Sequence, residues 1–213
     1  MHSFATDLAS GRLAPLTFDR LANPDGRAPE IVGGDLHLAV QRGAYDGPVH
    51  PGWEPSVRCE VREPGKIPLG VPVHHSFVLR LGADFPVSPL RMVVAQLKLN
   101  GGDSPLFALR VCRGRLLASW RLPGFDVEHH DRLAGCARAW TRFDLISDAH
   151  GAELLVDGDR VSRIRTRLDP ELTRYLKLGP YRDRDAGWGG APAMVEVRSV
   201  SRDVPSADLV RAA

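Results

Sequence analysis

Three residues near the C-terminal end of the chain have side-chain types and a spacing suited to a polar site. In a β-strand successive side chains point to opposite faces, so Tyr175, Lys177 and Tyr181 would share one face. The other face would carry Leu176 and Leu178. A strand that buries leucines and presents tyrosine, lysine and tyrosine is predicted to form the floor of a site.

Two earlier stretches follow the same design. Arg58, Glu60 and Arg62 alternate with apolar residues, and Gln96 and Lys98 project from an otherwise apolar strand. Guanidinium and amide groups both donate to carboxylate oxygens, so these side chains suit an anionic ligand. Each stretch also has a purely structural interpretation. The arginine–glutamate face could be a solvated strand face with weak ion pairs. The polar residues of the second strand could be satisfied by buried partners and not by a ligand in a cleft.

Short strand-like runs, separated by turn signals, must position these residues. The 17 prolines and 21 glycines favour turns over long helices. The expected strands are Glu30–Val32, Leu36–Val40, Ser56–Glu63, His75–Leu81, Met92–Leu99, Leu106–Cys112, Arg115–Trp120, Arg142–Ser147, Glu153–Val156, Arg160–Ile164 and Met194–Val200. This pattern predicts an all-β fold, an antiparallel β-sandwich or jelly roll. We expect one domain over residues 1–213, with a core from about 16 to 202 and peripheral ends.

The composition narrows the possible partners. A net charge of +2 is too small to indicate nucleic acid. Almost all basic residues are arginines, which suits carboxylates, although biased genome composition would give the same result. We expect no membrane span and no export signal, hence a cytoplasmic protein by default, and we expect a monomer. Three cysteines and no metal-ligand spacing predict neither a disulfide scaffold nor a metal site.

Together the three stretches resemble the polysaccharide lyases built on the concanavalin A-like jelly roll. That group includes the heparin lyase I, glucuronan lyase and alginate lyase types. The alginate lyases carry an Arg-x-Glu-Leu-Arg strand, a Gln-Ile/Val-His strand and a Tyr-Phe-Lys-Ala-Gly-x-Tyr strand. This chain has Arg58–Arg62, Gln96–Lys98 and Tyr175–Tyr181 in the same order, and the resemblance covers roughly residues 30 to 200.

The resemblance implies cleavage beside a uronic acid in an anionic polysaccharide by β-elimination. It implies that Gln96 with Arg58 or Arg62 neutralises the uronate carboxylate, and that Tyr181 is the general acid and also the base when the geometry allows. Cations such as Lys177 and Lys98 would favour the phenolate. Glu60, Tyr175 and the loop residue Trp188 are candidate substrate contacts. No cofactor is implied, although a structural calcium ion is possible, and the relatives' location is secreted or periplasmic.

Two positions depart from the lyase pattern. Lys98 stands where the alginate lyases have histidine, and Pro180 lacks a ladder donor, which suits an edge or bulged strand. Tyr181 could then perform both proton transfers, or His74, His75, His129 or His130 could supply a base, or the enzyme could be inactive. The alternative to a lyase is a non-catalytic carbohydrate-binding jelly roll. A glycoside hydrolase of this fold works with two carboxylates, commonly as Glu-x-Asp-x-x-Glu on one strand, and the sequence has no such run.

Overall fold

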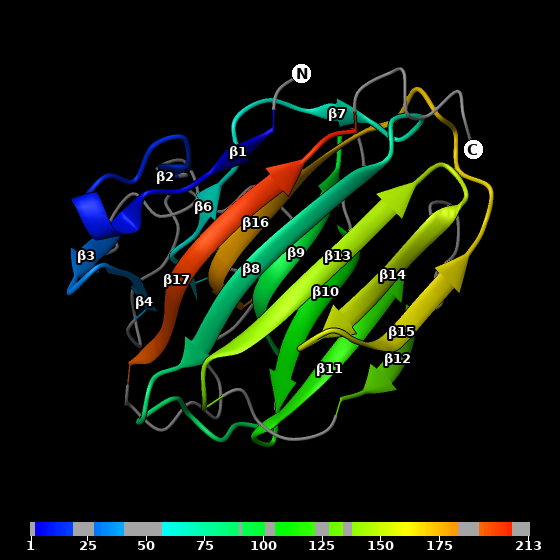
Figure 1. Cartoon of the computed structure of the whole chain (residues 1–213). Coiled ribbons are helices and arrows are strands. Elements are labelled where there is room, and N and C mark those ends of the chain that lie inside the picture. The colour runs from blue at the N-terminus through cyan, green and yellow to red at the C-terminus, as the bar shows by residue number, and fades with distance from the viewer. Residues whose placement is uncertain are drawn as a thin grey trace, which may run out of the picture.

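The chain folds into two antiparallel β-sheets packed face to face (Figure 1). The computed structural model describes residues 3–18, 28–40, 57–89, 91–100, 105–121, 128–133, 138–182 and 192–205. Within them the only helix is the short 3₁₀ turn Leu8–Ser10. The predicted all-β sandwich is therefore confirmed.

The first sheet has eight strands and lies in front in Figure 1. Its order is β15-β14-β13-β8-β17-β4-β3, and β1 pairs with β17. Its strands are β1 (Phe4–Ala5), β3 (Glu30–Val32), β4 (Asp35–Val40), β8 (Val73–Leu81), β13 (Thr141–Asp148), β14 (Gly151–Val156), β15 (Asp159–Arg165) and β17 (Ala193–Asp203).

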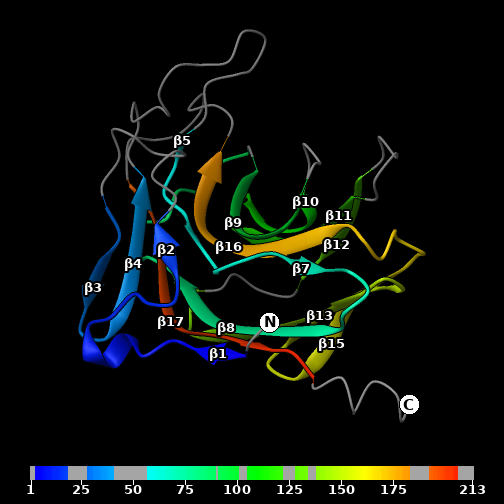
Figure 2. The same cartoon turned by 90° about the horizontal axis from the view of Figure 1, so that it is seen from above.

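The second sheet has nine strands, in the order β12-β11-β10-β9-β16-β6-β2, with β5 and β7 also paired to β16. Its strands are β2 (Thr17–Phe18), β5 (Val57–Arg58), β6 (Val61–Arg62), β7 (Ile67–Pro68), β9 (Met92–Leu99), β10 (Pro105–Cys112), β11 (Arg115–Arg121), β12 (Glu128–Arg132) and β16 (Thr173–Arg182). Figure 2 shows β9, β10 and β16 curving away from the first sheet. We call the outward side of this nine-stranded sheet the concave face.

The core lies between the sheets and follows the period-two pattern of strands. In β8 every second residue is buried, from Val73 to Leu81. Phe77 and Phe143 stack there with ring centroids 5.5 Å apart. Leu8 is only 2% exposed and belongs to the core. The core therefore begins before residue 16, the boundary expected from the sequence.

Buried charged groups also join the two sheets. The Arg174 guanidinium on β16 donates to the carbonyl of Ser147 on β13, at 2.9 Å. Arg202 on β17 and His75 on β8 both donate to Glu63, which follows β6, at 2.7 and 3.0 Å. No helix in the described residues is long and apolar enough to cross a membrane.

Candidate functional site

The three motif strands lie side by side in the nine-stranded sheet. β16 is flanked by β9 on one side and by β5 and β6 on the other. Tyr181 is paired with Arg58, and Lys177 is paired with both Arg62 and Gln96. Segments separated by more than 100 residues of sequence thus form one continuous surface.

The predicted alternation of the first motif is confirmed. Cys59 and Val61 are fully buried in the core, so Arg58, Glu60 and Arg62 face the opposite way, toward the concave face. Burial, together with the nearby Glu60 charge, raises the pKa of the Cys59 thiol to about 11, against an opposing backbone hydrogen bond at Ala39. The thiol is therefore protonated at neutral pH and acts as a packing group.

An irregularity in β16 places Tyr181. The pairing of β16 with β9 shifts between Leu178 and Tyr181, across Gly179 and Pro180. Gly179 has a φ of 130°, and a Cβ on it would lie 2.0 Å from the carbonyl oxygen of Cys59. Glycine is needed because the two backbones approach so closely. Pro180 lies in this irregular stretch, which agrees with the predicted bulge, whereas β16 is a central strand and not an edge strand.

A buried polar cluster occupies the centre of the three strands. The Glu60 carboxylate is fully buried, accepts a hydrogen bond from the Gln96 amide, and lies 3.3 Å from the Lys177 ammonium. Gln96 is 3% exposed and Lys177 is 6% exposed. Because a carboxylate only accepts hydrogen bonds, Glu60 fixes which end of the amide faces it. Glu60 thus orients Gln96 and Lys177.

Tyr181 and Arg58 lie at one end of this cluster and are both partly exposed. The Arg58 guanidinium carbon lies 4.4 Å from the centroid of the Tyr181 ring. A cation over an aromatic face is attracted by the ring's quadrupole, and it also stabilises negative charge that develops on the phenol oxygen. The pair places a hydroxyl group and a positive charge together at the surface of the concave face.

Lys98 lies at the other end of the cluster. It is paired with Tyr175, and Gln96 and Lys177 come between it and Tyr181 along the strands. Lys98 lies five positions along β9 from Val93, the partner of Tyr181, which is roughly 16 Å of strand. Lys98 therefore lies at the opposite end of the cluster from Tyr181, although the resemblance implied that its charge would favour the Tyr181 phenolate.

A cavity of about 280 Å³ lies beside this second end. It is lined by Thr17, Arg62, Glu63, Pro64, Gly65, Lys66 and Tyr175. Two of the predicted substrate-contact residues, Arg62 and Tyr175, therefore share a hollow with Lys66. A further cavity, of about 270 Å³, lies on β13, β14 and β15 of the other sheet and contains none of the predicted site residues.

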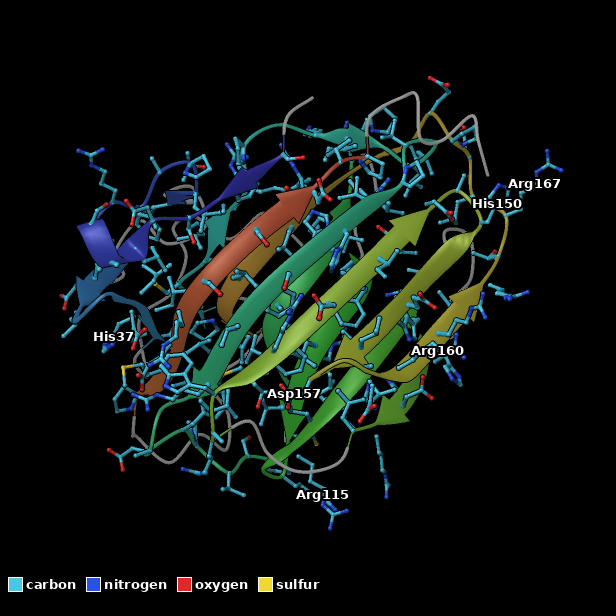
Figure 3. The ribbon with its side chains drawn as sticks, viewed as in Figure 1. His37, Arg115, His150, Asp157, Arg160 and Arg167 are labelled. Atoms are coloured by element: carbon cyan, nitrogen blue, oxygen red, sulfur yellow. The ribbon has the colours of Figure 1, made fainter. Side chains whose placement is uncertain are left out.

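Among the histidines of the described residues, only His130 faces the concave side. His37 on β4 and His150 after β13 lie on the eight-stranded sheet (Figure 3). His75 is buried against Glu63, and His74 contacts Asp144 at 2.8 Å on that same sheet. His129 pairs with the core residue Trp120, whereas His130 pairs with Ser119. Neither His74 nor His75 can supply a base at the concave face.

Some predictions lie beyond what the structure describes. Trp188 falls outside the described residues, so its place as a substrate contact stays a prediction. Within the described ranges, no three His, Cys, Asp or Glu side chains gather in a way that could hold a metal ion.

Sequence reasoning missed the rest of the concave face. The strand β12 was not expected, and Ser119 and Arg91 were not selected. The alternation in Arg115–Arg121 places Ser119 on one face, but nothing in that segment says which face is buried. The pairing of β11 with β10 and β12 places Ser119 on the same face as Gln96 and His130.

Comparisons with known proteins find the same fold in solved structures. No protein-family model and no curated protein sequence matches the chain. Alginate lyase A1-II', a member of polysaccharide lyase family 7, matches with a TM-score of 0.66 and 17% identity over 84% of each chain. An alginate lyase from Pseudomonas aeruginosa gives a TM-score of 0.65 and 18% identity, over 84% of this chain and 87% of that one.

A third solved structure extends the same comparison. The marine alginate lyase AlyA1 from Zobellia galactanivorans gives a TM-score of 0.64 and 14% identity, over 85% of this chain and 82% of that one. A variant of A1-II' has also been solved in complex with its substrate GGMG. The chain therefore has the jelly-roll fold of the solved family 7 alginate lyases.

Proposed function

We propose that the protein is a polysaccharide lyase that cleaves a uronic-acid-containing polysaccharide by β-elimination at the concave face. The observation that carries this proposal is the meeting of three lyase-like motifs on adjacent strands, β5 with β6, β16 and β9. The shared fold with solved alginate lyases supports it. Those proteins act on alginate, a uronate polymer, and we propose a substrate of the same chemical class.

The first requirement of the reaction is to neutralise the C6 carboxylate, because negative charge builds there as the C5 proton leaves. Preorganised hydrogen-bond donors at such a position supply a large share of catalysis. In our proposal the donors are the Gln96 amide with either Arg58, which lies beside Tyr181, or Arg62. The buried Glu60 holds the Gln96 amide in one orientation before substrate arrives.

The second requirement is proton transfer, which we assign to Tyr181. Its phenolate removes the C5 proton, the electron pair forms the C4–C5 double bond, and the C4–O4 bond breaks. The phenol then returns a proton to O4 of the leaving sugar. One residue serves both steps when the C5 hydrogen and O4 lie on the same side of the ring. The Arg58 cation over the Tyr181 ring supports the phenolate in this scheme.

The position of Lys98 supports a binding role for this residue. It lies beside Tyr175 and is separated from Tyr181 by Gln96 and Lys177. A charged lysine can pair with a carboxylate but cannot take a proton. We therefore assign Lys98, with Tyr175, to a neighbouring sugar of the polymer.

Replacing Tyr181 with phenylalanine tests this assignment. We expect Tyr181→Phe to lower the release of unsaturated uronate ends by roughly 100- to 10,000-fold, because the general acid and base are both lost. The ultraviolet absorbance of the new double bond measures the rate against a panel of uronate polymers. Tyr175→Phe removes a hydroxyl from the same strand and face at a residue that we assign to binding, so it should change KM more than kcat.

Full activity in Tyr181→Phe, with an unchanged circular dichroism spectrum, would refute the role of Tyr181. A wild-type protein that binds uronate polymers but releases no unsaturated product points to the second candidate function, a non-catalytic carbohydrate-binding domain. The observation that favours this candidate is Lys98 at the position where the alginate lyases have histidine.

A further inference from the structure

The strand register continues the line of site residues across the sheet, away from the proposed catalytic centre. Gln96 on β9 is paired with Ala108 on β10, which is paired with Ser119 on β11, which is paired with His130 on β12. Three inter-strand spacings separate Gln96 from His130, or roughly 14 Å. Only an oligosaccharide, and no single sugar, can bridge that distance.

His130 stands at the far end of this line in a defined network. Its Nδ1 lies 2.9 Å from the Ser119 hydroxyl, and its Nε2 lies 2.6 Å from Nη1 of Arg91. A guanidinium can only donate hydrogen bonds, so the His130 Nε2 must accept from Arg91. The ring proton is then on Nδ1, and Nδ1 donates to the Ser119 hydroxyl. In this arrangement the imidazole holds the Arg91 guanidinium in place.

Further cations follow a second line, parallel to the first. Tyr181 is paired with Val93, Val93 with Arg110, Arg110 with Leu117, and Leu117 with Arg132. Arg110 and Arg132 thus lie on the concave face beside the Ser119–His130 pair. Asp131, next along the chain, points the other way and accepts a hydrogen bond from Ser162 on β15.

We propose that Arg91, His130 and Ser119 form a distal carboxylate-binding subsite that holds a second uronate of the same polymer. This inference rests on the proposed function, since it takes its ligand from the same substrate. A guanidinium has five N–H donors, so Arg91 can contact the imidazole and a carboxylate together. The polymer then lies across strands β9 to β12, and affinity depends on chain length.

Binding of uronate oligosaccharides from disaccharide to hexasaccharide, measured by calorimetry on the full chain, tests the subsite. The measurement uses the Tyr181→Phe background so that the ligand stays intact. We expect Arg91→Ala to weaken hexasaccharide binding by roughly 10- to 100-fold, the effect of one lost charged hydrogen bond. Disaccharide binding should not change. Arg91→Lys should recover part of the loss, because it restores the charge but not the planar donor geometry.

Two controls separate this contact from general electrostatics. Arg167→Ala removes an equal charge from an exposed position remote from the concave face (Figure 3) and should leave both affinities unchanged. A hexasaccharide whose carboxylates have been reduced to alcohols should bind Arg91→Ala and its parent equally.

The possible failures are distinguishable. Equal weakening of short and long ligands by Arg91→Ala, or no weakening of either, overturns the distal subsite and leaves the proposed function standing. Absence of uronate binding by both the wild type and Tyr181→Phe overturns the proposed function and the subsite together.

Discussion

At the scale of single residues, the Glu60 carboxylate organises the centre of the concave face. It accepts from Gln96 and lies 3.3 Å from the Lys177 ammonium, with all three side chains almost completely buried. Removing one partner of a buried ion pair is costly because the remaining charge has already lost its hydration. Glu60 therefore affects the stability of the fold as well as the orientation of the site.

The change Glu60→Gln keeps the shape and an acceptor for Gln96 but removes the negative charge. We expect it to lower the free energy of unfolding by about 3–5 kcal/mol. Adding Lys177→Met should recover part of that loss, because the double variant no longer buries this positive charge. Urea unfolding of the two single variants and the double variant gives the coupling energy, and strict additivity would contradict a direct charge interaction.

The alternation at Arg58–Arg62 could be predicted from the sequence, but the depth of the site could not. A strand pattern says which side chains share a face, and Cys59 and Val61 do face the core. It does not say whether the opposite face is open to solvent. Glu60 is fully buried because strands from distant parts of the chain surround it, and no local signal carries that information.

At the scale of elements, one glycine allows β5 and β6 to pair with the irregular part of β16. Gly179 has a φ of 130°, and its α-carbon faces the Cys59 carbonyl with no room for a side chain. Tyr181 follows two residues later and pairs with Arg58. The contact between the proposed acid and its cation thus depends on a close backbone approach.

We expect Gly179→Ala to destabilise the fold far more than Gly158→Ala. Gly158 has a φ of 92° and open space where a Cβ would stand. Its replacement therefore lowers the free energy of unfolding only by the strain of alanine in a left-handed conformation, roughly 1–2 kcal/mol. Gly179→Ala adds a steric clash with backbone, which a rotamer change cannot relieve. Denaturant unfolding of both variants measures the difference. Similar losses would show that β16 can shift away from Cys59 at little cost.

Local signals predicted some elements and missed others for a physical reason. The turns at Gly33-Gly34 and Asp157-Gly158 contain glycines with positive φ values, which glycine adopts freely, and the strands on both sides of each turn were predicted. The strands β1, β2, β7 and β12 were not predicted. Three of them have two residues each, and β12 is Glu-His-His-Asp-Arg, with no apolar alternation. These strands form because they pair with a neighbouring strand of the sheet, and their amino-acid composition does not distinguish them from loops.

At the scale of the whole molecule, the two sheets are joined by charged groups as well as by the core. Glu63 accepts from His75 and Arg202 of the opposite sheet and from the Leu176 backbone. Burial opposes ionisation of Glu63 and is the largest single influence. The hydrogen bonds from His75 and Leu176 and the charge of Arg202 together outweigh it and lower the pKa of Glu63. Burial lowers the pKa of Arg174, the other inter-sheet arginine, to about 10, so it stays charged at neutral pH.

Because the Glu63 pKa is lower in the folded chain than in the unfolded one, its contribution to stability has a defined sign. The contribution is present above the unfolded value, about 4.3, and is lost as the pH falls through the folded value. Glu63→Gln cannot ionise, and it removes the charge opposite Arg202. We expect a loss of about 3–5 kcal/mol at neutral pH, with the difference from wild type shrinking as the pH falls below about 4.

Urea unfolding of wild type and Glu63→Gln over a series of acidic pH values measures this convergence. Glu171→Gln is the matched control, since Glu171 is exposed and the change removes the same charge. Parallel stability curves for wild type and Glu63→Gln would mean that Glu63 does not titrate across the unfolding transition. The contacts of Glu63 with His75 and Arg202 would then stabilise the fold independently of the charge on Glu63. Convergence would show that the charge of Glu63 itself helps to hold the concave sheet against its partner.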